Sequence, residues 1–156
     1  DDIQDINQQF RKGELAGALE QANRYLAGKP KDAQARFLKG LILADLGKTS
    51  EAIDVLSGLT EDYPELPEPY NNLAVLYAAQ GQYDDARNAL EQAIRAHPGY
   101  ATAHENLGDI HAKMAAIAYA KALSLDSDKA TAQTKLKLIQ GMLGDQAVSP
   151  ATAPDR

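Results

Sequence analysis

The sequence contains no cysteine and no apolar run that approaches the roughly 18 residues of a membrane-spanning helix. Without cysteine there can be no disulfide, no thiolate zinc site and no cysteine nucleophile. Basic residues are in the minority, with 16 Lys and Arg against 22 Asp and Glu, for a formal net charge of −6. Because affinity for nucleic acid depends largely on clustered Lys and Arg, this balance disfavours a nucleic-acid partner.

The sequence also lacks an initiator methionine and a recognisable signal peptide. It opens on DDIQDI at residues 1–6, already inside an expected helix. We interpret this start as a processed or trimmed end from which a signal peptide has been removed. The absence of cysteine does not fix the compartment, but it fits an oxidising one such as the bacterial periplasm. We therefore favour an exported, periplasmic protein over a cytoplasmic one.

What the sequence does contain is an internal repeat of 34 residues. Prolines, glycines, alanines and a mixed series of small residues each recur at this interval, at Pro30, Pro64 and Pro98, at Gly13, Gly47 and Gly81, at Ala18, Ala52 and Ala86, and at Gly40, Ala74 and Gly108. Glycine allows the chain to turn at the end of one helix, and proline prevents the next helix from continuing. Each helix pair has an apolar face that only a neighbouring pair can bury. The repeat therefore predicts a stack of antiparallel helix pairs.

The most regular copy is residues 67–100, PEPYNNLAVLYAAQGQYDDARNALEQAIRAHPGY. It resembles the tetratricopeptide repeat (TPR) family, in its bacterial type, at Tyr70, Leu73, Ala74, Tyr77, Gly81, Tyr83, Ala86, Leu90, Ala93 and Pro98. Residues 33–66 are a second full copy, although Arg36 and Thr49 replace two of the aromatic residues. The resemblance covers about residues 3–140 and implies an all-α, right-handed solenoid of antiparallel helix pairs.

The repeat pattern divides the chain into six segments. We expect a partial repeat at 1–32, full repeats at 33–66 and 67–100, a shortened repeat at 101–128, a capping helix at 129–143 and a flexible linker or tail at 144–156. Five residues that would form the turn of the shortened repeat are absent, and no Gly, Pro, Asn or Asp occurs from Ile110 to Leu125. We predict one long helix over 102–125, with a sharp turn near Ala115 as the alternative.

The capping helix carries more apolar residues than an ordinary surface helix, because Leu138 and Met142 widen its apolar face. We expect neighbouring helices to bury it on two sides. The alternative is that Leu138 and Met142 form an apolar edge for self-association.

No set of residues has the spacing of a catalytic or metal site, so we expect no enzyme, cofactor or metal. His104 and His111 share a helix face but lie about 10.5 Å apart along the axis, with Gly108 between them. They occupy positions that are Tyr70 and Tyr77 in the preceding repeat, which favours a role in packing. No serine has a histidine at a supporting spacing, and the glycines are not clustered as in a phosphate-binding loop.

The resemblance implies that the first helix of each pair lines a concave groove that holds a partner. The implied groove positions are Asn7, Arg11, Phe37, Leu41, Asp45, Asn71, Val75, Ala78, Glu105, Asp109 and Lys113. Among them the Asn71 amide could both donate to and accept from a bound peptide backbone. Family members that bind acidic chaperone C-termini use Lys and Asn where this chain has Phe37 or Asn71 and Leu41 or Val75. A cochaperone role is therefore disfavoured.

Together these patterns predict a non-enzymatic scaffold or adaptor that binds a peptide or helix of another protein in its groove. The alternative is a structural spacer or homodimerisation module joined to a further domain, which could itself be catalytic.

Overall fold

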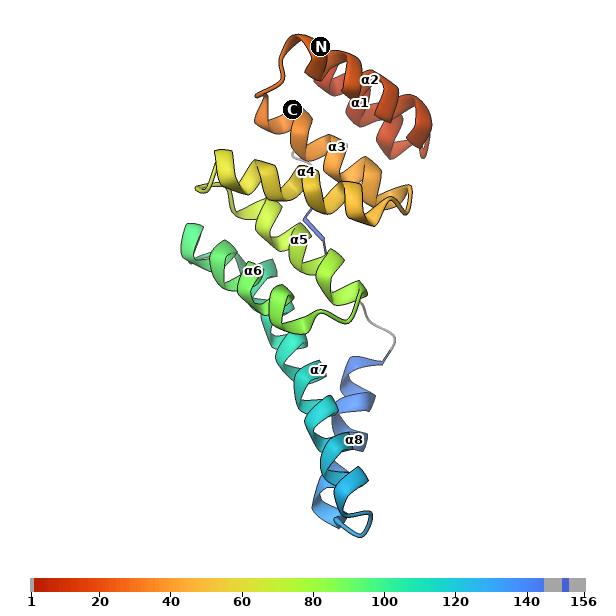
Figure 1. The fold of residues 1–156 in the computed structure, drawn as a ribbon, viewed down its shortest axis with the longest axis vertical. Coiled ribbons are helices and arrows are strands. Elements are labelled where there is room, and N and C mark those ends of the chain that lie inside the picture. The colour runs from red at the N-terminus through yellow and green to blue at the C-terminus, as the bar shows by residue number, and fades with distance from the viewer. Residues whose placement is uncertain (1, 145–149, 152–156) are drawn as a thin grey trace.

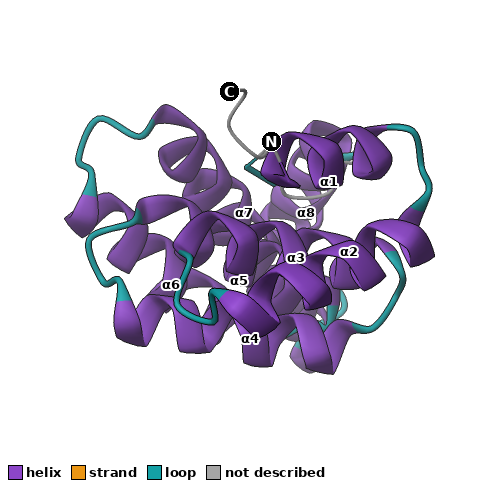
Figure 2. Ribbon diagram, turned by 90° about the horizontal axis from the view of Figure 1, so that it is seen from above, coloured by secondary structure: helices purple, strands orange, loops and turns teal. Residues whose placement is uncertain are grey.

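The structure, a computed structural model, describes residues 2–144 and 150–151 of the chain. Within these ranges the regular elements are all helices, in the order α1 (Asp2–Arg11), α2 (Leu15–Gly28), α3 (Ala33–Asp45), α4 (Thr49–Asp62), α5 (Pro67–Ala79), α6 (Tyr83–Ala96), α7 (Ala101–Leu125) and α8 (Ala130–Leu143). Each helix packs on the next one along the chain, and the helices form a curved stack (Figures 1 and 2). The predicted all-α solenoid of antiparallel helix pairs is confirmed.

The turn inside each regular pair depends on a glycine with positive φ. Gly13, Gly47 and Gly81 have φ values of 79°, 77° and 75°, a region that residues with a Cβ rarely adopt. After Gly81, the N–H of Gln82 reaches back to the carbonyl oxygen of Tyr77 at 2.9 Å. The same bond closes the other two turns, so all three helices end in a Schellman motif. The glycine spacing therefore marks real helix ends.

Close approach of the two helices in a pair depends on a small residue in the first helix. A Cβ added to Gly40 of α3 would lie 2.6 Å from Cδ2 of Leu56 in α4. Leu56 is only 1% exposed, so its side chain cannot move away easily. Gly108 occupies the same repeat position in α7, yet a Cβ there would meet nothing within 4 Å. Among the described helices none folds back over Gly108, because α7 continues past the point where the regular pairs turn.

The predicted long helix is confirmed, because α7 runs without a break from Ala101 to Leu125, over 25 residues. Its buried residues, however, stop at Ile110. The first half of α7 thus completes the core of the stack. The second half extends beyond α6 and packs against α8, as Figure 1 shows.

The expectation that α8 is buried on two sides was wrong. Among its residues only Ala132 is buried, while Leu138 and Met142 remain 69% and 62% exposed. The cause is the extension of α7, which carries α8 away from the stack and leaves α7 as its main neighbour among the described helices (Figure 1). Ile117 and Leu125 of α7 are also exposed on this helical hairpin.

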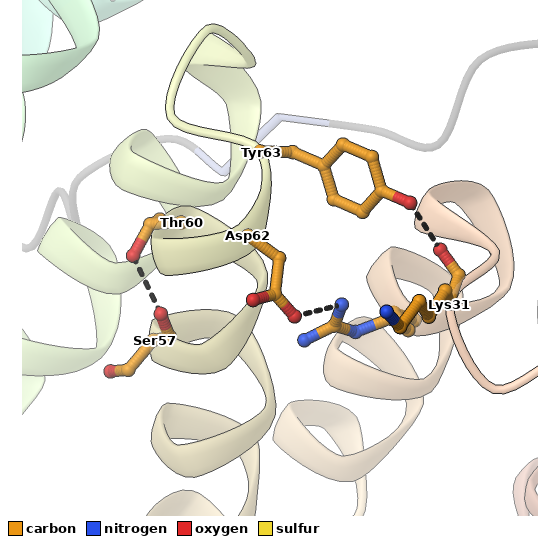
Figure 3. Close-up of polar contacts among 6 residues, drawn as sticks. Lys31, Ser57, Thr60, Asp62 and Tyr63 are labelled. Atoms are coloured by element: carbon orange, nitrogen blue, oxygen red, sulfur yellow. Dashed lines mark hydrogen bonds and ion pairs between the residues drawn. The ribbon is translucent and has the colours of Figure 1, made fainter.

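A polar network joins α3 to α4 and the end of α4 to the loop that precedes α3. Arg36, which replaces an aromatic residue of the repeat, forms an ion pair with Asp62 at the end of α4, with Nη1 2.7 Å from Oδ2. The Tyr63 hydroxyl donates to the carbonyl oxygen of Lys31 at 2.6 Å, as Figure 3 shows. A Cβ at Gly58 would lie 3.2 Å from Nη2 of Arg36, so the guanidinium lies close over the backbone of α4.

The first helices of the next two pairs, α5 and α7, each form a side-chain hydrogen bond at the same repeat position. The Tyr70 hydroxyl donates to the carbonyl oxygen of Pro64 at 3.2 Å, and Nε2 of His104 lies 2.7 Å from that of Pro98. Since a carbonyl oxygen only accepts, the proton on the His104 ring resides on Nε2 in this arrangement. His104 therefore takes the structural role of the tyrosine in the preceding repeat, in agreement with the packing role inferred from its position.

The two glycines at one repeat position should respond oppositely to alanine. We expect Gly40→Ala to lower the free energy of unfolding by about 1–3 kcal/mol, because the new methyl group overpacks against Leu56. Gly108→Ala should raise it by up to about 1 kcal/mol, because alanine favours the helix and meets open space. Urea unfolding of both variants tests the pair. A stabilised Gly40→Ala would contradict the close packing described above.

Tyr100, which precedes α7, should make the fold sensitive to alkaline pH. Burial, and secondarily the negative charge of Glu68, raise the pKa of Tyr100 from 10.0 to about 12. The folded state therefore holds this proton more tightly than the unfolded state. Its contribution to stability is complete below pH 10 and is lost as the pH rises towards 12.

The measurement compares thermal unfolding of the wild type with that of Tyr100→Phe between pH 8 and 12, because other groups titrate in the same interval. We expect the difference between the two proteins to change with pH in favour of the variant, which has no phenol to ionise. A difference that stays constant across this interval would contradict the assignment.

Candidate peptide-binding groove

The first helices of the regular pairs, α1, α3 and α5, line one hollow face of the stack. This groove encloses a cavity of about 640 Å³. Its lining consists of Asn7, Phe10, Arg11, Gly40, Leu41, Ala44, Asp45, Leu56, Asn72, Val75, Leu76, Pro150 and Ala151. The last two residues belong to the chain's own C-terminal segment, which returns to the groove from beyond α8.

The groove combines apolar walls with a few polar groups. Phe10, Val75 and Leu76 are partly buried and extend the hydrophobic core to the groove surface. One cationic side chain, Arg11, and one anionic side chain, Asp45, also line it. This mixture of apolar surface with few polar groups is typical of sites that bind organic ligands or peptides.

Asn72 is a polar groove residue whose side chain forms hydrogen bonds with the backbone of Ala151. Its side chain is almost fully buried, at 4% exposure. Nδ2 donates to the carbonyl oxygen of Ala151 at 3.2 Å, and Oδ1 accepts from the N–H of Ala151 at 2.8 Å. One amide therefore holds both backbone groups of a single residue, a contact that does not depend on that residue's side chain.

The eleven predicted groove positions do not form one site. Five of them line the cavity, namely Asn7, Arg11, Leu41, Asp45 and Val75. Phe37, Asn71 and Ala78 are buried in the core instead, at 5%, 0% and 7% exposure. Glu105, Asp109 and Lys113 lie on α7 outside the cavity lining, and Nζ of Lys113 is 5.8 Å from the centre of the Tyr83 ring.

Asn71, the predicted backbone-binding amide, lies between α5 and α7. Its Oδ1 accepts a hydrogen bond of 2.9 Å from Nδ2 of Asn106. Its neighbour Asn72 faces the groove instead. The sequence carried a signal for this, because the position of Asn72 in the preceding repeat holds Leu38, which is buried. A polar residue at this core position requires a partner, and Asn106, which holds the same position in the following repeat, has one in Asn71.

Of the predicted tail at 144–156, the structure describes residues 144, 150 and 151. Gly144 follows α8, and Pro150 and Ala151 lie in the groove. The predictions for 145–149 and 152–156 fall outside the described residues.

Across the described chain, no three His, Asp or Glu side chains come together in a way that could hold a metal ion. None of its helices combines the length and apolarity needed to cross a membrane.

Comparison with known families now identifies the fold. A family model described as tetratricopeptide repeat matches residues 7–67 and 71–130. The chain belongs to the tetratricopeptide repeat family. The turns, the close helix pairs and the groove described above are therefore those of a TPR array.

Similar proteins contain the array in different settings. A stretch of 85 residues, 52% of this chain, is 38% identical to 20% of the probable biofilm formation methyltransferase WspC of Pseudomonas putida. The crystal structure of MamA has a TM-score of 0.65 at 24% identity, over 91% of this chain and 81% of that one. The first TPR of Spaghetti (RPAP3), bound to the HSP90 peptide SRMEEVD, has a TM-score of 0.67 at 15% identity, over 72% of this chain and 89% of that one.

The chain spans between 17% and 29% of the length of the curated relatives it matches. The structural likenesses above are below 25% identity and concern the fold of the TPR array.

The Asn71–Asn106 bond between α5 and α7 can be tested by a double-mutant cycle. Asn106→Leu should lower the free energy of unfolding by about 1–3 kcal/mol, because a buried amide of Asn71 loses a partner. The double variant Asn71→Leu with Asn106→Leu should recover part of this loss, since both polar groups are then removed together. Urea unfolding of the four proteins measures the coupling. Strictly additive effects would show that the bond contributes nothing.

Proposed function

We propose that this chain is a non-enzymatic scaffold whose groove, lined by α1, α3 and α5, binds an extended segment of a partner protein. The TPR fold supports the general role in interactions between proteins. The observation that carries the proposal is the Asn72 amide, which donates to and accepts from a peptide backbone beside apolar walls. Such walls contribute affinity through buried area, whereas the amide orients the bound chain.

The charge of the groove bears on the kind of partner. Arg11 and Asp45 give the lining one positive and one negative side chain. The RPAP3 domain was solved with the peptide SRMEEVD, which has three acidic side chains and one basic. A groove of mixed charge favours a segment that is mainly small and apolar over such an acidic one. The net charge of −6 likewise opposes nucleic acid as a partner.

The match with WspC does not favour an enzymatic role. It covers one fifth of that protein and about half of this chain, and the TPR family model matches most of this chain, at residues 7–67 and 71–130. We therefore retain the non-enzymatic scaffold as the proposed function.

The proposal is tested by selecting ligands for the full chain from a random peptide library and measuring their affinity for groove variants. We expect Val75→Glu and Asn72→Leu each to weaken the selected peptides at least about tenfold, a loss of about 1.4 kcal/mol. Leucine occupies the position of Asn72 in the preceding repeat, at Leu38, so this second variant keeps an apolar residue that the fold accepts.

Leu138→Glu is the matched control, because it places the same charge on an exposed apolar residue of α8 that does not line the groove. Circular dichroism verifies that each variant is folded. If the selected peptides bind all variants equally, the groove is not the binding site. If Leu138→Glu alone abolishes binding, the partner surface is the apolar edge of α8, and light scattering then tests the predicted homodimer.

A further inference from the structure

The segment Pro150–Ala151 lies in the groove. Ala151 contacts Asn72 there, although the two residues are 79 positions apart in the sequence. In Figure 1 this short segment lies beside α5, apart from the end of α8. Ala151 is partly buried and packs against the hydrophobic core of the repeats. The groove is therefore filled, at this point, by part of the same chain.

The contact has the geometry of a bound peptide. Asn72 uses its donor and its acceptor on the two backbone groups of Ala151. The methyl group of Ala151 is turned to the core, whereas Pro150 is exposed. Proline before it has a fixed φ and loses little conformational freedom on binding. The groove thus holds a Pro–Ala unit that Asn72 binds through the backbone of Ala151.

The path of the chain explains how this segment reaches the groove. The 25 residues of α7 span about 37 Å, and the part of the helix beyond Ile110 leads away from the stack. The 14 residues of α8 then run back along α7 towards α5, as Figure 1 shows. From Gly144 to Pro150 the chain can span at most about 20 Å. The hairpin of α7 and α8 therefore delivers the C-terminal segment to the open side of the groove.

We propose that Pro150–Ala151 is an internal ligand of the groove, which an extended segment of a partner must displace at Asn72. A tethered segment has an effective concentration on the order of millimolar, so that even a weak contact stays populated. The segment lowers the apparent affinity of a competing peptide by the fraction of grooves it occupies. The competing ligand has the same chemistry, a proline followed by a small residue in an extended backbone.

The internal contact is tested first without any partner. Ala151→Pro removes the N–H that donates to Oδ1 of Asn72, whereas the control Ala151→Ser keeps it. In the nuclear magnetic resonance spectrum of the full chain, we expect the side-chain amide signals of Asn72 to shift in Ala151→Pro and to stay near wild type in Ala151→Ser. The Ala151 amide proton of the wild type should exchange with solvent at least about tenfold more slowly than an unprotected one. An unprotected Ala151 amide, or unchanged Asn72 signals in Ala151→Pro, would overturn the proposal.

The competition is tested with a synthetic peptide of residues 144–156 added to the full-length variants. It should bind Ala151→Pro at least about tenfold more tightly than the wild type or Ala151→Ser, because the groove of Ala151→Pro is vacant. Asn72→Leu should not bind it. Equal affinity for Ala151→Pro and the wild type, or no affinity for either, would refute the internal ligand.

Only the competition with a partner rests on the proposed function, and the two ideas fail separately. If library peptides bind through Val75 and Asn72 while the Ala151 amide is unprotected, the groove binds partners but the internal ligand is wrong. If Ala151 is protected in the wild type and no library peptide binds even Ala151→Pro, in which the groove is vacant, the internal ligand stands and the proposed function is wrong.

Discussion

The structure depends on how closely two helices of a pair can approach. At Gly40 the absence of a side chain leaves the space that Leu56 fills. This contact holds α3 and α4 together, and the buried apolar faces of successive pairs then form one continuous core. The first helices of the pairs are aligned side by side as a consequence, and their free faces form the groove. The first helices of the pairs therefore form the groove on one face because their opposite face is packed in the core.

The fourth repeat illustrates what happens when the turn is lost. The chain has no glycine at the expected end of the first helix, and the helix continues to Leu125. Gly108 remains at the position that would allow close approach, but it meets open space. The end of the core at Ile110 and the exposed residues of α8 follow from this one missing turn.

Much of the fold could be predicted from the sequence because the determinants are local and periodic. The three glycines with positive φ and the uninterrupted α7 both follow from residue types at known positions. The surroundings of α8 could not be predicted, because burial on a second side depends on where α7 carries it and not on its own apolar residues. The family resemblance assigned Asn71 to the groove, whereas its neighbour Asn72, about 100° away around the helix, lines the cavity. The signal for Asn72 was the buried Leu38 at the same position of the preceding repeat. The contact of Ala151 has no sequence signal apart from the buried amide that it satisfies.

The end of the core at Ile110 also determines how the protein opens. In a repeat array each unit is stabilised mainly by its immediate neighbours, so local unfolding is easiest where one neighbour is missing. The hairpin of α7 and α8 has a neighbouring pair on one side among the described helices. In α8 only Ala132 is buried. Fraying of α8 would lengthen the tether of the C-terminal segment and dilute it around the groove. The stability of this hairpin therefore sets the local concentration of the residues that fill the groove.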